Sequence, residues 1–155
     1  MPETAERLRT RAKALGVTVP PDAEARLVTY FDLLFRWNAK INLTSLTAPD
    51  AAIDRLLLEP LAAAEELPRN PDLIDLGSGG GSPAIPLALA LEARRLVMVE
   101  SKTRKAAFLA EAGPCDSVCF TAGEAGRGSS SRLRTTLVAG GWIRAASMSL
   151  VTSAT

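Results

Sequence analysis

A glycine-rich segment between two short apolar runs holds the residues best suited to chemistry. Gly77, Gly79 and Gly81 stand at alternate positions between Asp75 and Ser82. Glycine lets a chain turn sharply after a strand and lets the backbone approach a ligand without a Cβ in the way. A helix that starts near Ser82 would add a partial positive charge. The segment therefore predicts a loop that binds a nucleoside cofactor.

Two acidic residues flank this loop. Glu100 follows Gly81 by 19 residues and ends the second apolar run, where a carboxylate can accept hydrogen bonds from both hydroxyls of a ribose. Asp75 suits a cofactor that carries an ammonium group, as S-adenosylmethionine does, and would repel a pyrophosphate. The GxGxG spacing, with no Gly-Lys-Ser/Thr after it, argues against a phosphate-binding P-loop. A dinucleotide oxidoreductase is thus disfavoured, and a glycine-rich surface loop without a ligand is the other alternative.

The composition excludes several chemistries. The sequence has no histidine, so neither a Ser-His-Asp or Cys-His nucleophile system nor a histidine-ligated zinc site can form. Cys115 and Cys119 do not form a CxxC motif, so we expect no metal and a reducing, cytoplasmic location. No apolar run approaches 18 residues and the charged N-terminus lacks a signal-peptide pattern, so we expect no membrane association.

The elements that must position these residues follow from periodicity and breakers. Residues 1–68 read as helices, with an apolar helical period from Leu27 to Ile41, a cap at Thr47 and a kink or restart at Pro60. The apolar runs at 72–76 and 96–99 predict two strands buried on both faces. A helix at 83–91 follows the first strand, and a helix at about 101–112, capped by Ser101, follows the second. This order of a strand, a glycine loop, a helix, a strand that ends in the acidic Glu100, and a second helix is typical of the first part of a doubly wound α/β domain.

Three motifs resemble one family. The run from Asp75 to Leu87 is similar to D-x-G-[ST]-G-x-G-[FL]-P-G-[IL]-P-[LI] of the 16S rRNA (guanine-N7) methyltransferases, also called the glucose-inhibited division protein B family. The run from Leu34 to Thr44 resembles that family's L-x-x-W-N-x-x-x-N-L-T signature, and the run from Glu100 to Leu109 its D-S-x-x-K-[RK]-x-x-F-L signature. The resemblance covers about residues 20–112.

The resemblance implies a Rossmann-like S-adenosylmethionine-dependent methyltransferase fold, incomplete here and preceded by a helical N-terminal extension. It implies transfer of a methyl group to N7 of a guanine in 16S rRNA of the small ribosomal subunit, by a monomer. Guanine N7 already carries a lone pair, so proximity and alignment suffice without a strong base. An inactive nucleoside-binding fragment is the alternative. The residues expected to hold the cofactor are Asp75, Gly77, Gly79, Gly81, Ser82, Glu100, Ser101 and Lys102.

The sequence departs from the family pattern at several positions. Ser82 replaces a bulky residue, Ala84 a glycine and Leu56 a histidine. The later motifs are missing: Glu124 is a weak candidate for the acidic residue that meets adenine, and the arginine of strand four is absent.

The composition changes after Gly113. The last 43 residues hold six Gly, seven Ser, five Thr and no Lys, with only eight Leu, Ile, Val or Phe, which is close to the range of chains that hold no core. Short strands are conceivable at 117–120 and 137–138. We expect a helical extension at 1–68, the first part of the methyltransferase domain at 69–112, and a poorly structured tail at 113–155 that is read out of frame or otherwise divergent. A compact natural variant whose tail forms its own short strands is the alternative.

The charge distribution weakly favours an anionic partner. Residues 1–100 hold 11 Lys and Arg against 14 Asp and Glu, whereas residues 101–155 hold 7 against 3. Lys102, Arg104 and Lys105 lie beside the expected cofactor loop and are candidates for RNA contact. A solvated surface is the alternative. Trp37 reads as a core residue in preference to a base-stacking platform.

Overall fold

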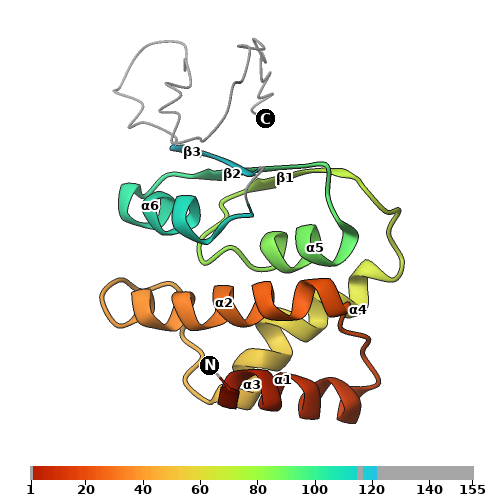
Figure 1. The fold of residues 1–155 in the computed structure, drawn as a ribbon. Coiled ribbons are helices and arrows are strands. Elements are labelled where there is room, and N and C mark those ends of the chain that lie inside the picture. The colour runs from red at the N-terminus through yellow and green to blue at the C-terminus, as the bar shows by residue number, and fades with distance from the viewer. Residues whose placement is uncertain (1, 115–116, 122–155) are drawn as a thin grey trace, which may run out of the picture.

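The computed structural model describes residues 2–114 and 117–121, which form a small parallel sheet packed on a layer of helices (Figure 1). In chain order the elements are α1 (Pro2–Leu15), α2 (Pro21–Asn38), α3 (Pro49–Ile53), the π-helical turn η1 (Asp54–Leu58), α4 (Glu59–Ala64), β1 (Asp72–Leu76), α5 (Ala84–Leu91), β2 (Arg95–Glu100), α6 (Thr103–Ala112) and β3 (Ser117–Thr121).

The sheet confirms the predicted α/β character. Its order is β1-β2-β3 and all neighbouring strands are parallel, with Leu76 opposite Val99 and Glu100 opposite Thr121. Both predicted strands lie where the apolar runs placed them, and the strand expected at 117–120 is β3. Because the strands are parallel, the loops after β1 and β2 leave the sheet at one edge, the carboxyl edge.

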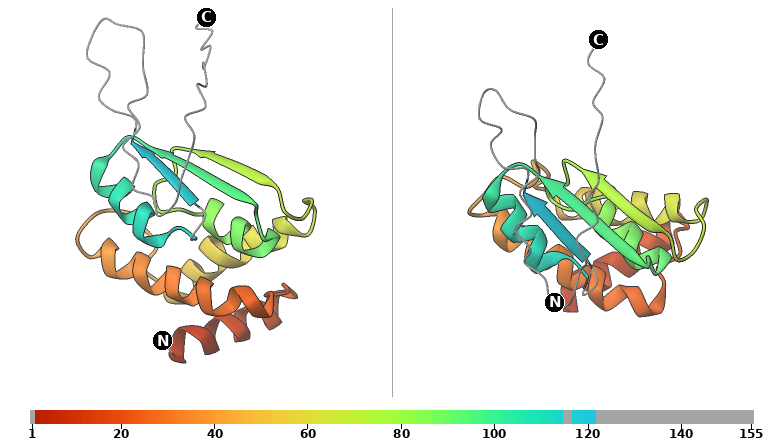
Figure 2. Two further views of the ribbon diagram at one scale, coloured as in Figure 1. Left: turned by 45° about the horizontal axis from the view of Figure 1, so that its top comes forward. Right: turned by 90° about the horizontal axis from the view of Figure 1, so that it is seen from above.

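One face of the sheet is open in the described part of the chain. α5, α6 and α2 all lie on the same side of the three strands (Figures 1 and 2). On β1 the side chains of Ile74 and Leu76 are 59% and 68% exposed, whereas Leu73 is packed against the core. The expectation that β1 is buried on both faces is therefore wrong for the described residues, since their helices cover one face only.

The N-terminal helices share one hydrophobic core with the sheet. The apolar stripe of α2 is buried through Leu27, Tyr30, Phe31 and Leu34, and α2 contacts both α5 and α6. Leu27 and Leu34 are fully buried in the same cluster as Met98 of β2. The helical period of residues 27–34 thus predicted the face by which this layer packs on the sheet.

Three predicted helix boundaries are wrong. α2 ends at Asn38 and not near Ile41, because the Asn38 Oδ1 accepts hydrogen bonds from the N–H groups of Leu43 and Thr44 and turns the chain. The residue before α3 is Ala48, with Pro49 starting the helix, so Thr47 is not the cap. Lys102 precedes α6, and the Ser101 hydroxyl points to Glu100 instead of capping the helix.

Four earlier expectations fall outside the described residues. They concern the strand at 137–138, Glu124 as an adenine contact, the absent strand-four arginine, and most of the tail at 113–155.

Candidate cofactor site at the carboxyl edge of the sheet

The loop after β1 needs its glycines for conformation. Gly77, Gly79 and Gly81 have φ values of +83°, +53° and +83°, a left-handed region that side chains with a Cβ rarely adopt. Gly81 is also packed so closely that a Cβ would lie 2.6 Å from the Ile85 Cδ1. A Cβ on Gly77 would meet nothing within 4 Å, so open space lies beside the start of the loop.

The N–H groups of this loop are bonded within the protein. Gly77 donates to the carbonyl of Val99 at 2.7 Å, and Gly81 donates to the carbonyl of Ser78 at 2.7 Å. Gly79 donates to the Glu100 Oε2 at 2.9 Å. These groups, which the sequence suggested would face a ligand, instead hold the loop against the end of β2.

Glu100 makes hydrogen bonds to the loops after both β1 and β2. It is only 6% exposed, and its Oε1 accepts hydrogen bonds from the Lys102 N–H at 2.8 Å and the Ser101 hydroxyl at 3.3 Å. Burial by itself would raise the Glu100 pKa, but the hydrogen bonds from Lys102, Gly79 and Ser101, together with the charge of Lys105, outweigh it and lower the pKa. Glu100 is therefore an ionised carboxylate that joins the loops after both strands.

Asp75 differs from Glu100, because its side chain makes no hydrogen bond or ion pair to the described residues. Its Oδ2 is buried and accepts no hydrogen bond from the described residues, while its backbone carbonyl accepts one from the Ser78 hydroxyl at 3.1 Å. A buried carboxylate oxygen without a partner is costly. A ligand that donates hydrogen bonds beside Asp75 would remove that cost.

The N-terminal helices support the loop from behind. The Tyr30 hydroxyl donates to the Gly80 carbonyl at 2.6 Å, and burial raises the pKa of this hydroxyl. A Cβ on Gly80 would lie 3.2 Å from the carbonyl oxygen of Leu43, so the chain after α2 also packs closely on the loop.

Ser82 also points away from the expected ligand side. Its hydroxyl donates to the carbonyl of Leu56 at 2.9 Å. Pro60, four residues after Leu56, has no N–H to bond that carbonyl, and the π-helical turn η1 lies just before it. Ser82 therefore satisfies an acceptor that the predicted helix irregularity at Pro60 leaves open.

The structure thus brings Asp75, Gly77, Gly79, Glu100 and the backbone of Lys102 together at the carboxyl edge. Gly81 and Ser82 pack into the protein behind them. Sequence reasoning missed Tyr30 and Leu56 as supports of the loop. Tyr30 gave a signal only as one member of an apolar helical stripe, and nothing local marks the Leu56 carbonyl except Pro60.

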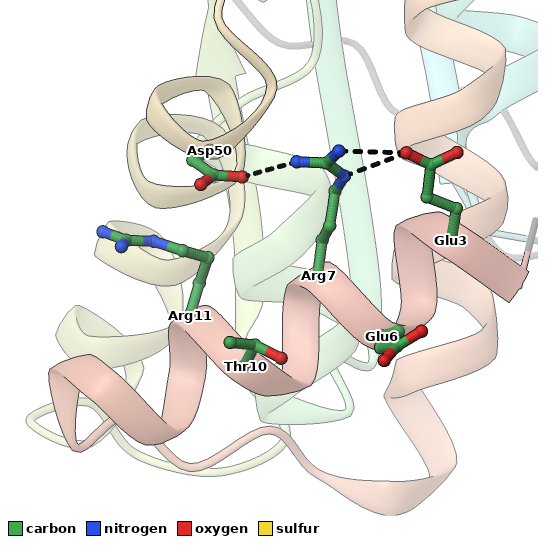
Figure 3. A pocket seen from close by; sticks show the side chains of 6 residues that line it. All are labelled: Glu3, Glu6, Arg7, Thr10, Arg11 and Asp50. Atoms are coloured by element: carbon green, nitrogen blue, oxygen red, sulfur yellow. Dashed lines mark hydrogen bonds and ion pairs between the residues drawn. The ribbon is translucent and has the colours of Figure 1, made fainter.

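A separate cleft lies between α1 and the start of α3 and contains none of the expected site residues (Figure 3). Its volume is about 330 Å³, and Glu3, Glu6, Arg7, Thr10, Arg11 and Asp50 line it. Arg7 bridges Glu3 and Asp50 at 3.0 and 3.1 Å. Both arginines of the lining are ion-paired, Arg7 with Glu3 and Asp50 and Arg11 with Asp54, so the cleft offers no free cation to a ligand.

The described residues hold neither a cluster of metal ligands nor a membrane-spanning helix. No group of three or more His, Cys, Asp or Glu side chains in that part of the chain could hold a metal ion. None of its helices is both long and apolar enough to cross a membrane.

A glycine loop after the first of three parallel strands, bonded to a buried acid at the end of the second, defines an α/β protein with its site at the carboxyl edge of the sheet. Residues 23–115 match the model of the family described as rRNA small subunit methyltransferase G, and the chain belongs to this family. The resemblance inferred from the three sequence motifs is confirmed, and the matched range agrees with the expected 20–112.

Several curated proteins named "Ribosomal RNA small subunit methyltransferase G" are similar to this chain. One from Myxococcus xanthus is 40% identical over 104 residues, which are 67% of this chain and 48% of that protein. One from Azoarcus is 40% identical over 108 residues, 70% and 51% of the two chains. One from Pseudomonas aeruginosa is 36% identical over 107 residues, 69% and 50%. The chain spans about half the length of these relatives.

Proposed function

We propose that this chain binds S-adenosylmethionine at the carboxyl edge of a Rossmann-like sheet and serves methyl transfer to N7 of a guanine in 16S rRNA of the small ribosomal subunit. The observation that carries the proposal is Glu100, ionised and bonded to the glycine loop at the end of β2. The names of the relatives support the reaction and the kind of RNA.

The residues present fit this cofactor. The Asp75 Oδ2 is a buried acceptor without a described partner, suited to the ammonium group. Open space beside Gly77 leaves room above the start of the loop. The Glu100 Oε2 accepts one hydrogen bond, from the Gly79 N–H, and keeps a lone pair suited to a ribose hydroxyl, whereas Oε1 already accepts two, from Lys102 and Ser101.

The bound cofactor would supply an electrophilic methyl group on a sulfonium. This chain's own residues would then bind and orient. Asp75 would hold the ammonium group of the cofactor and Glu100 its ribose, and Gly77 would let the cofactor lie close to the backbone. No residue needs to remove a proton, because guanine N7 already carries a lone pair, and the absence of histidine is compatible with that chemistry.

Asp75→Asn gives the sharpest test of cofactor binding. The change removes a charge that makes no hydrogen bond to the described residues, so we expect the melting temperature to stay the same or rise. The affinity for S-adenosylmethionine, measured by calorimetry, should fall about 10- to 100-fold, the equivalent of about 1.5–3 kcal/mol for a lost charged hydrogen bond.

Asp72→Asn is the matched control, because Asp72 lies on the same strand but pairs with Arg94 at the opposite end of β1. It should leave the affinity unchanged. Equal affinities for the wild type and Asp75→Asn would remove Asp75 from the site.

Binding without transfer is the second candidate, since the family match covers residues 23–115 and the matched part spans only about half the length of the relatives. A methyl-transfer assay on small ribosomal subunits separates the two. Incorporation of methyl groups into 16S rRNA supports the enzyme, and cofactor binding without incorporation supports the nucleoside-binding protein.

A further inference from the structure

The basic residues of the described chain fall into two groups according to their ion pairs. Six arginines are paired with acidic side chains, all on the N-terminal helices or near the amino ends of the strands; they are Arg7, Arg9, Arg11, Arg55, Arg69 and Arg94. Eight others make no ion pair among the described residues. Three of these are scattered over α1, the first half of α2 and the start of β2, namely Lys13, Arg26 and Arg95. The other five belong to the end of α2, the turn after it and the start of α6. We call Arg36, Lys40, Lys102, Arg104 and Lys105 the basic edge.

The fold brings the two halves of the basic edge together. Trp37 of α2 stacks edge-on against Phe108 of α6 with ring centroids 6.0 Å apart, and its indole N–H donates to Glu111 at 3.0 Å. The two helices run in opposite directions, so that the C-terminal end of α2 and the N-terminal end of α6 lie at the same side of the molecule (Figure 1). Lys40 follows the C-terminal end of α2 and Arg104 belongs to the first turn of α6, the two helix ends that lie on that side.

Arg36 lies in the last turn of α2 and Lys40 two residues after the end of that helix, and both are exposed. Lys102 and Arg104 are exposed as well. The acidic side chains nearest to them along the chain have other partners. Asp32, four residues before Arg36, accepts a hydrogen bond from the Thr4 hydroxyl at 2.8 Å. Glu100 accepts hydrogen bonds from backbone N–H groups, and Glu111 accepts the Trp37 indole bond. The basic edge is thus a group of cations without ion pairs among the described residues, and it borders the loop carrying Gly79 and Glu100.

We propose that the basic edge binds the phosphate backbone of the RNA substrate and brings a base to the site above the glycine loop. This inference rests on the proposed function and names the surface that holds its substrate. Lysine and arginine side chains that neutralise phosphates release counterions, which gives binding a steep dependence on salt. Phosphate contacts of this kind set register and orientation, while the cofactor site selects the atom.

The surroundings favour RNA over an anionic lipid surface. A surface that lies on a membrane needs apolar side chains among its cations, to enter the acyl boundary. In the part of the chain that the structure describes, the exposed large apolar side chains are Leu15, Leu67, Ile74 and Leu76. None of them is on α6 or in the last turn of α2, so the basic edge offers charge without an apolar anchor.

The test compares two triple variants of the full chain that lose the same charge. Arg36→Gln, Lys40→Gln and Arg104→Gln are combined in the first, which leaves the expected cofactor residue Lys102 intact. Lys13→Gln, Arg26→Gln and Arg95→Gln are combined in the control, because these exposed cations also make no ion pair but lie in the last turn of α1, the first half of α2 and the first position of β2.

Filter binding with 16S rRNA transcribed in vitro gives the readout. At about 0.1 M monovalent salt the first variant should lose about 10- to 100-fold in affinity, and its slope of log affinity against log salt should become shallower by about 2, as expected for three lost phosphate contacts on a single strand. The control variant should stay near the wild type. The single reversal Lys40→Glu should also weaken binding.

Equal losses in both triple variants, or none in the first, would overturn the proposal. So would binding to phosphatidylglycerol vesicles that the first variant alone loses while its RNA affinity is unchanged. Calorimetry with S-adenosylmethionine is independent of this outcome, because none of the changed residues is assigned to the cofactor. Absent cofactor binding in the wild type would end the proposed function but leave the RNA comparison decisive.

Discussion

Glu100 and Asp75 are both acidic residues at strand ends, yet the structure gives them different roles. Glu100 accepts hydrogen bonds from Gly79, Ser101 and Lys102, so it shapes the site even before a ligand binds. The buried Asp75 Oδ2 has no partner in the described residues, so its charge gains a role only with a ligand. One carboxylate is therefore structural as well as functional, and the other is a candidate for binding alone.

The lowered pKa of Glu100 predicts a dependence of stability on pH. Because its folded pKa lies below the ordinary value of 4.5, ionised Glu100 stabilises the fold above that pH, and the stabilisation is lost as the pH falls through the folded pKa. Glu100→Gln should destabilise the protein at pH 7 by about 1–3 kcal/mol, since the amide turns a donor toward a backbone N–H. The difference from the wild type should shrink below pH 4.5 in urea unfolding.

Glu65→Gln provides the comparison, because Glu65 is exposed and makes no ion pair in the described part of the chain. Its difference from the wild type should stay small at every pH. A Glu100→Gln difference that is constant from pH 7 to below pH 4.5 would contradict the ionised, hydrogen-bonded carboxylate.

At the scale of elements, the contact between α2 and α6 connects the N-terminal helices to the sheet. Trp37 is half-buried and packed against the hydrophobic core, so it is a core residue as the sequence indicated and not a free aromatic platform. Its ring packs on Phe108 and its N–H reaches Glu111, which places its apolar surface inside and its polar edge at the surface.

This half-burial predicts a graded response at Trp37. Trp37→Ala removes the ring contact and should lower the free energy of unfolding by about 2 kcal/mol, below the range of about 3–5 kcal/mol for a fully buried ring. Trp37→Phe keeps much of the ring contact and loses one exposed hydrogen bond, so it should cost less than about 1 kcal/mol. Denaturant unfolding of both variants measures the difference. If Trp37→Ala lowered the free energy of unfolding by less than Trp37→Phe does, the ring would contribute no packing.

At the scale of the whole molecule, the described sheet is unprotected on one face. Ile74 and Leu76 lie exposed on β1, and β1 pairs with a described strand only along its β2 edge. Exposed apolar side chains beside an unpaired strand edge favour association between molecules. The described residues alone therefore form a domain with a strong tendency to aggregate.

The tail carries a prediction about the coding sequence. The family match stops at residue 115, and the composition changes at Gly113 to Ser, Gly, Thr and Arg without Lys. We expect residues 113–155 to be read out of frame. Sequencing the gene and translating the other two frames beyond the Gly113 codon should give a segment with a strand four that ends in an Asp-x-Val-x-x-Arg-Ala run. The idea is wrong if neither frame contains such a segment.

The amino-acid sequence by itself determined the features that depend on neighbouring residues. Apolar runs placed β1 and β2, the helical period of residues 27–34 gave the buried face of α2, and the glycine pattern with Asp75 and Glu100 located the site and the family. These signals are local because strands, helices and tight turns depend on the side chains and backbone freedom of a few consecutive residues.

Only the tertiary structure decided which distant groups meet. Tyr30 donates to Gly80 across 50 residues, Ser82 to Leu56 across 26, and Trp37 to Glu111 across 74. It also decided that one sheet face is open and that the loop N–H groups bond to Glu100 and Val99. Such contacts depend on how whole helices pack on the sheet, because packing brings together donors and acceptors that no local pattern relates.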